Sequence, residues 1–256
     1  MSLAVKLALA PLLLAQAVQT RRRVPVLPEA AGARSGELGG AGAGDTVLRV
    51  LIVGDSSAAG VGVDHQDRAL AGWLTRALAA ALPLRVRWTL IAQSGVTSAQ
   101  ALTLVRQAQP AAHDVAVVVT GVNDVVAQVA VRRAVQARAA LADWLRAHAQ
   151  VRHVAYAALP PMHRFPALPQ PLRWVVGADA QRHERALAAW VAQRAHAQGD
   201  VSHVPIAIGL GPEHMAHDGF HPGEPVYRAC GEAIAAHLAS VAIPPDRSGP
   251  GGGGPR

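Results

Sequence analysis

Apolar runs alternate along most of the chain with stretches in which apolar residues recur at helical spacing. Five short runs rich in valine, leucine, isoleucine and alanine are typical of buried strands, at 48–53, 85–92, 115–120, 151–158 and 201–208. Apolar residues three or four positions apart predict helices between and after them. These helices are expected at 70–82, 98–107, 131–145, 172–191 and 223–239.

This alternation predicts one parallel sheet with helices on both faces, because right-handed crossovers join parallel strands. Sites in such sheets lie where the strands end. Three polar motifs occupy matching positions. Gly-Asp-Ser at 54–56 follows the first strand, Gly-Val-Asn-Asp at 121–124 follows the third, and Asp-Gly-Phe-His-Pro at 218–222 precedes the last helix. We expect the three motifs to meet at one edge of the sheet.

The ends of the chain differ from the patterned region. Residues 25–46 are rich in glycine, alanine and proline and are predicted to be a flexible linker, while 244–256 is predicted to be a disordered tail. The folded domain is therefore expected at 47–243. Residues 1–24 are apolar and end in arginines, and three interpretations stay open: a cleaved signal, a helix on a membrane surface, or a soluble arm. Localisation is left undecided.

Composition narrows the possible classes of protein. With 256 residues, 51% of them hydrophobic, the chain can build one core but is short for two domains. The net charge of +7 comes mostly from arginines along helical segments, without interleaved aromatic residues, so no nucleic-acid partner is predicted. The single cysteine, Cys230, excludes an internal disulfide and lies in a helical pattern, where a buried structural thiol is expected.

Two of the motifs together supply the groups for nucleophilic catalysis. Ser56 is the candidate nucleophile, and a serine hydroxyl needs a base within hydrogen-bond reach. His221 is the candidate base, and Asp218, three residues earlier, can accept a hydrogen bond from its imidazole. Taken alone, each motif also fits an ordinary turn with a capping aspartate. Their order and their placement at strand ends favour the catalytic interpretation.

The residues after the predicted strands also include hydrogen-bond donors for a developing oxyanion. Asn123 follows an apolar strand, so its amide can project from the carboxyl end of the sheet. A helical turn that begins at Ser56 would offer free backbone N–H groups. Gly95 can offer another backbone N–H, or it can be a plain turn glycine. We expect Asp124 to brace the loop, and we expect Ser98 to cap the helix at 98–107.

These residues resemble the SGNH hydrolase family, also called GDSL esterases and lipases, over 48–238. The first and third family blocks match 54–56 and 121–124, and the last block matches Asp218 and His221. The glycine of the second block corresponds to Gly95, although Gln93 and Ser94 stand where an asparagine is often found. Ser57 replaces the leucine that usually follows the serine.

The resemblance implies a fold and a set of roles. The fold would be a three-layer α/β/α sandwich of flavodoxin type with a five-stranded parallel sheet. Ser56 would be the nucleophile of a Ser56–His221–Asp218 triad, with an oxyanion hole made by Ser56, Gly95 and Asn123. The predicted function is a serine esterase that acts on small or medium acyl esters, without a cofactor. The loop after the fourth strand either flanks the acyl group or packs on the core, through Met162, Phe165 and Leu168.

Other functions stay open at this point. An acyltransferase would share the acyl-enzyme. A member of the same fold could be catalytically silent and bind a partner or a membrane. A phosphate cradle at 54–62 lacks the ending of a P-loop. A metal site could use His214, His217, Asp218 and His221, but no typical zinc motif is present. The oligomeric state is not predicted.

Overall fold

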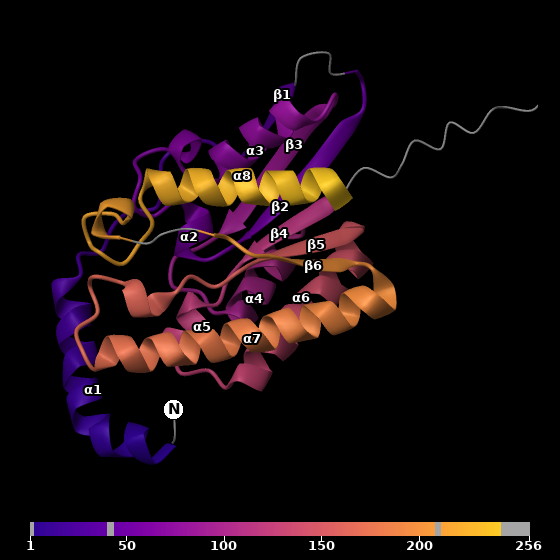
Figure 1. Cartoon of the computed structure of the whole chain (residues 1–256). Helices are drawn as coiled ribbons and strands as arrows, with labels where there is room; N and C mark the ends of the chain where they lie inside the picture. The colour runs from indigo at the N-terminus through magenta and orange to yellow at the C-terminus, as the bar shows by residue number, and fades with distance from the viewer. Residues whose placement is uncertain (1–2, 40–43, 208–210, 242–256) are drawn as a thin grey trace, which may run out of the picture.

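The computed structural model describes residues 3–39, 44–207 and 211–241, which form a three-layer α/β/α sandwich (Figure 1). Within these residues the central sheet has six strands in the order β1-β3-β2-β4-β5-β6. Five of them are parallel, and they lie at β2 (Val47–Gly54), β3 (Arg85–Ala92), β4 (Val115–Val119), β5 (His153–Ala157) and β6 (Val201–Val204). The predicted fold class is confirmed.

The predicted strands are found with small shifts at their ends. The largest difference is at β6, which stops at Val204 although the apolar run was expected to continue to 208. Pro205 follows immediately, and a proline has no N–H to donate to the sheet. Residue 208 itself lies outside the described residues.

One strand lies where we expected a flexible linker. β1 (Ser35–Gly39) pairs antiparallel with β3, with Ser35 opposite Thr89 and Gly39 opposite Arg85. The carboxylate of Glu37 pairs with Arg85 and Arg87 of β3. All five residues of β1 are exposed, so backbone pairing and surface charge hold this edge strand. Part of the expected flexible linker is therefore a sixth strand, which adds an antiparallel edge to the five predicted parallel strands.

Helices cover both faces of the sheet, and each face has its own hydrophobic cluster. β2 shows the division, because Val50 and Ile52 belong to one cluster and Leu51 and Val53 to the other. Helices α3 (Leu70–Ala81) and α8 (Glu224–Val241) pack on the first face. The second face is covered by α4 (Ser98–Ala108), α6 (Val131–Ala149) and α7 (Leu172–Gln198) (Figure 1).

The start of α4 differs from the expectation. Thr97, rather than Ser98, is the N-cap, and it forms a reciprocal capping box with Gln100. The hydroxyl of Ser98 is buried and donates to Asp124 at 2.6 Å. The serine that suggested a cap is therefore part of the framework beneath the site.

The N-terminal helix α1 (Leu3–Arg23) lies against the beginning of α7 at one end of the molecule (Figure 1). Lys6 forms an ion pair with Asp179, and the side-chain amide of Gln16 donates to the Gln170 carbonyl at 2.6 Å. Of the helices in the described ranges, none is long and apolar enough to cross a membrane. The predicted tail, 244–256, lies outside those ranges.

Candidate active site

The turn after β2 places Ser56 at the carboxyl end of the sheet. A short helix, α2 (Ser56–Ala59), begins at Ser56, and Asp55 caps it by accepting the Ser57 N–H at 3.0 Å. A side chain at position 54 would place its Cβ 2.4 Å from the Val119 carbonyl oxygen, so only glycine fits there. Because Ser56 occupies the first helical position, its N–H has no acceptor within the helix.

Asp218 and His221 form a connected pair in the turn before α8. One carboxylate oxygen of Asp218 accepts the backbone N–H groups of Phe220 and His221, both at 2.9 Å. The other oxygen lies 2.6 Å from His221 Nδ1. Burial opposes ionisation of Asp218, but the hydrogen bonds from the His221 ring and from the two backbone N–H groups outweigh it and hold the carboxyl pKa below its ordinary value. An ionised Asp218 keeps the proton on Nδ1, which leaves Nε2 as a proton acceptor.

A single apolar pocket brings Ser56 and His221 together. Both line it, together with residues from the ends of β4 and β5 and from α8. No hydrogen bond joins the Ser56 and His221 side chains in the described part of the chain. The structure thus brings the Ser56 hydroxyl, the His221 imidazole and the Asp218 carboxylate to the carboxyl ends of the parallel strands.

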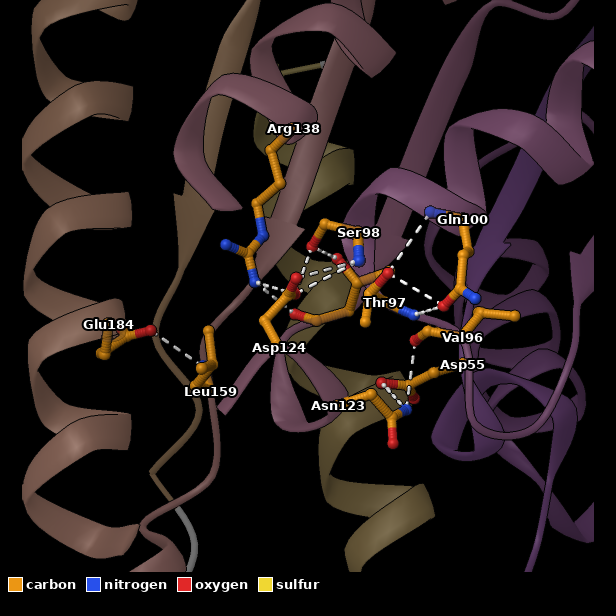
Figure 2. Close-up of polar contacts among 11 residues, drawn as sticks. Asp55, Val96, Thr97, Ser98, Gln100, Asn123, Asp124, Arg138, Leu159 and Glu184 are labelled. Carbon is orange, nitrogen blue, oxygen red and sulfur yellow. Dashed lines mark hydrogen bonds and ion pairs between the residues drawn. The ribbon is translucent and has the colours of Figure 1, made fainter. Parts of the chain in front are cut away.

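Asn123 lies beside the Asp55–Ser56 turn, in the first turn of α5 (Val122–Val126). Its side-chain nitrogen donates to the Val96 carbonyl at 3.1 Å and lies 3.4 Å from a carboxylate oxygen of Asp55 (Figure 2). The second contact is long, so one amide proton is weakly engaged.

Gly95 directly precedes Val96, the residue whose carbonyl holds Asn123. Its φ of 82° lies in the left-handed region, and its position is exposed. Neither Gly95 nor Asn123 is among the described residues that line the pocket with Ser56 and His221. Asn123 therefore lies on the Asp55 side of the turn, and Gly95 is next in sequence to the carbonyl that holds it.

A buried network beneath Asn123 fixes its loop. Asp124 accepts the Ser98 hydroxyl and lies 3.5 Å from Arg138 of α6, which also donates to the Thr120 carbonyl at 3.0 Å (Figure 2). Burial lowers the pKa of the Arg138 guanidinium. A Cβ at Gly121 would lie 2.3 Å from this guanidinium, so the loop and the arginine fit closely.

Sequence reasoning missed Arg138. Its signal was nevertheless present, because it shares helical spacing with the buried residues Ala134, Leu141 and Leu145. An arginine in the apolar stripe of a helix indicates a buried charge that needs a partner.

Asp55 is the other buried acid at the site. It is 2% exposed, and burial raises the pKa of its carboxyl to about 6, against the opposing effect of the Ser57 N–H. Asp55 therefore changes charge at mildly acidic pH, and it lies one residue before the candidate nucleophile.

The loop after β5 contributes one of its three predicted residues to the pocket. Phe165 lines the pocket, whereas Met162 and Leu168 are buried in the hydrophobic cluster on the α7 side. The hydrogen bond from the Leu159 N–H to Glu184 of α7, at 2.9 Å, anchors the start of this loop (Figure 2). The suggestion that Met162 and Leu168 flank an acyl group was wrong, because their side chains fill the core.

The alternative of a metal site at His214, His217, Asp218 and His221 finds no support in the arrangement of the described residues. His214 turns back on its own loop, where its Nδ1 accepts the Gly211 N–H at 3.1 Å. Within the described ranges, no group of three or more histidine, cysteine, aspartate or glutamate side chains is arranged to hold a metal ion.

A family model, the GDSL-like Lipase/Acylhydrolase family, matches residues 52–229 of the chain. The chain belongs to this family. The match includes the motifs at 54–56, 121–124 and 218–222, so the resemblance to SGNH hydrolases is confirmed. Membership also confirms the predicted class of enzyme, a serine esterase of the GDSL type.

Solved structures of this GDSL-type fold are similar to the chain at low sequence identity. A structure described as TesA is 23% identical, with a TM-score of 0.55, and the match covers 76% of this chain and 99% of that one. A family 3 carbohydrate esterase from Clostridium thermocellum is 17% identical, with a TM-score of 0.56 and coverages of 77% and 98%.

A third similar structure is the psychrotrophic esterase EstA from Pseudoalteromonas sp. It is 17% identical, with a TM-score of 0.52 and coverages of 75% and 97%. At these identities the likeness concerns the fold alone. Comparison with curated protein sequences found no match.

Proposed function

We propose that this protein hydrolyses carboxylic esters through an acyl-enzyme formed on Ser56. The observation that supports this most directly is the Asp218–His221 pair, hydrogen bonded at 2.6 Å, in a turn that shares an apolar pocket with Ser56. The family match supports ester hydrolysis in general. Two of the similar structures are described as esterases, which agrees with the same class.

In the proposed reaction, Ser56 Oγ attacks the ester carbonyl while His221 Nε2 takes its proton. The imidazolium that forms is stabilised by Asp218, whose carboxylate keeps the ring oriented. When the tetrahedral intermediate collapses, the C–O bond to the alcohol breaks and His221 returns the proton to the leaving oxygen. Water, deprotonated by His221, then attacks the acyl-enzyme and releases the carboxylic acid and free Ser56.

The oxyanion of each tetrahedral intermediate is assigned three donors: the N–H of Ser56, the N–H of Gly95 and the side-chain amide of Asn123. Asn123 is held by the Val96 carbonyl, and its second amide proton, which Asp55 engages only at 3.4 Å, is the one assigned to the oxyanion. A preorganised donor of this kind is worth about 3 kcal/mol in the transition state.

The test is hydrolysis of para-nitrophenyl esters by wild type, Ser56→Ala and the matched control Ser57→Ala. Ser57 also lines the pocket but has no role in the proposed reaction. We expect Ser56→Ala to lose essentially all turnover and Ser57→Ala to keep most of it, with or without a chelator. Turnover that survives Ser56→Ala, or that disappears with chelator, would refute the proposal.

A further inference from the structure

The pocket at Ser56 extends under α8. Its lining includes Val226, Tyr227, Cys230 and Ile234 of α8. The opposite wall is made by residues at the carboxyl ends of three strands: Val119 of β4, Ala157 of β5 and Ile206 just after β6. The pocket is therefore a gap between a helix and the sheet that this helix covers.

Helix geometry gives the direction and reach of this gap. Tyr227, Cys230 and Ile234 recur at intervals of three and four residues, which places them on one face of α8. With a rise of about 1.5 Å per residue, Ile234 lies about 12 Å farther along the helix than Val226. His221 precedes the helix, so the pocket begins at the imidazole and runs away from it along α8.

Beyond Ser56 and His221, the side chains that line the pocket offer a substrate almost no hydrogen-bond partner. The Tyr227 hydroxyl donates its one proton to the Val61 carbonyl at 2.6 Å, so it has no donor left for a substrate. The Cys230 side chain is half-buried, and burial raises the pKa of its thiol to about 12, so it stays uncharged. At the far end, Ile234 has no exposed surface. Such a space suits a linear hydrocarbon and excludes sugars and charged groups.

We infer that this gap holds the acyl chain of the ester, and that Cys230 and Ile234 set the longest chain that fits. The inference rests on the proposed function of Ser56. The acyl group, rather than the alcohol, is assigned to the gap because the alcohol leaves midway while the acyl group stays attached to Ser56. A space closed at its far end suits the part that remains.

The experiment compares kcat/KM for para-nitrophenyl acetate, butyrate, octanoate and decanoate. The variants are wild type, Cys230→Phe, Cys230→Ala and the control Ala236→Phe, which adds the same ring on the exposed face of α8. For wild type, we expect kcat/KM to rise by roughly fourfold per methylene until the chain reaches Cys230. Cys230→Phe should lower the octanoate-to-acetate ratio at least tenfold, Cys230→Ala should shift the optimum to longer chains, and Ala236→Phe should leave the ratio unchanged.

Several results would overturn the inference. One is a Cys230→Phe protein with a wild-type Tm whose kcat/KM falls equally for all esters or does not change. Another is a preference that follows the alcohol in a series of alkyl acetates. If Cys230→Phe does not fold, Cys230→Leu and Cys230→Ala give the same comparison.

A parallel Ser56→Ala series separates the two claims. If Ser56→Ala abolishes hydrolysis of every ester while the chain-length profile ignores position 230, only the inference about α8 fails. If hydrolysis survives Ser56→Ala, the proposed function fails, whatever the effect of the Cys230 variants.

Discussion

Asp55 lies in the turn that carries the candidate nucleophile, and its carboxylate is almost completely buried. Its carboxylate caps α2 and lies near Asn123, yet it has almost no contact with solvent. Desolvation raises the carboxyl pKa from an ordinary 3.8 to about 6. Between these two values the folded state binds more protons than the unfolded state, so this group makes stability fall as pH rises.

Replacing Asp55 by Asn should remove this pH dependence. The free energy of unfolding of Asp55→Asn minus that of wild type should increase by about 2 kcal/mol between about pH 4.5 and about pH 7.5. Urea unfolding of both proteins at the two pH values measures this difference. Other titrating groups cancel because both proteins contain them. If the difference is constant with pH, or decreases, the pKa of the Asp55 carboxyl is not raised in the folded state.

Asp218 should be needed for the tautomer of His221 rather than for the fold. In Asp218→Asn the amide can no longer favour a proton on Nδ1, so Nε2 becomes a poor base. We expect kcat for a para-nitrophenyl ester to fall by at least about 100-fold, with KM changed much less. Circular dichroism should show a folded protein. A kcat within a factor of two of wild type would argue against the assigned role.

The candidate site residues that the sequence predicts are those with short-range signals. Ser56, Asp218 and His221 lie in compact motifs beside strand or helix ends, and these motifs could be located before any coordinates. Burial depends on contacts between segments that are distant in sequence, so the raised pKa of the Asp55 carboxyl could not be predicted from the sequence. The reassignment of Ser98 from cap to framework has the same cause, since Asp124 lies 26 residues away in sequence.

At the scale of elements, α6 supports the loop that carries Asn123. Arg138 comes from the middle of this helix and reaches the Thr120 carbonyl and Asp124. Removing one partner of a buried ion pair leaves an uncompensated charge, typically at a cost of about 3 to 5 kcal/mol. The loop between β4 and α5 should therefore lose its geometry when the arginine is lost.

Arg138→Met tests this support. We expect a loss of about 3 kcal/mol in the free energy of unfolding and a kcat lower by at least about tenfold, with a smaller change in KM. Arg138→Lys should recover part of kcat. The matched control is Arg133→Met on the exposed face of the same helix, which should behave like wild type. Equal effects of the two Met variants, or an unchanged kcat in Arg138→Met, would contradict a positioning role.

The elements themselves were predictable to different degrees. β4 is almost entirely valine and has all but its last residue buried, so its apolar run predicted a buried strand. β1 has an exposed Ser-Gly-Glu-Leu-Gly sequence and owes its existence to the edge of β3. No local pattern encodes pairing of that kind, because the partner lies about 50 residues away and supplies backbone hydrogen bonds rather than an apolar face.

At the scale of the whole molecule, the sheet and its site are complete without α1. This helix touches the domain mainly at α7, through Lys6 and Gln16, while much of its apolar surface, including Leu7 and Leu14, is exposed. The three sequence interpretations of residues 1–24 stay open. Each of them is compatible with a helix that adds little to the site.

Removing residues 1–24 should therefore leave the enzyme active. We expect kcat/KM for a short para-nitrophenyl ester within about twofold of the full chain, and a Tm lower by no more than about 4 °C, the change typical of 1 kcal/mol in a domain of this size. Steady-state kinetics and thermal unfolding measure the two quantities. Loss of activity with a preserved Tm would show that α1 contributes directly to the site.

The measurement that tests the account most directly is the site of covalent labelling by a fluorophosphonate, located by intact mass and peptide mapping. This reagent reports an activated serine without assuming a natural substrate. The account predicts one adduct, on Ser56, in wild type and in Ser57→Ala, and none in Ser56→Ala or His221→Ala. A folded wild type that is not labelled, or a Ser56→Ala protein that is labelled elsewhere, including at Cys230, would contradict it.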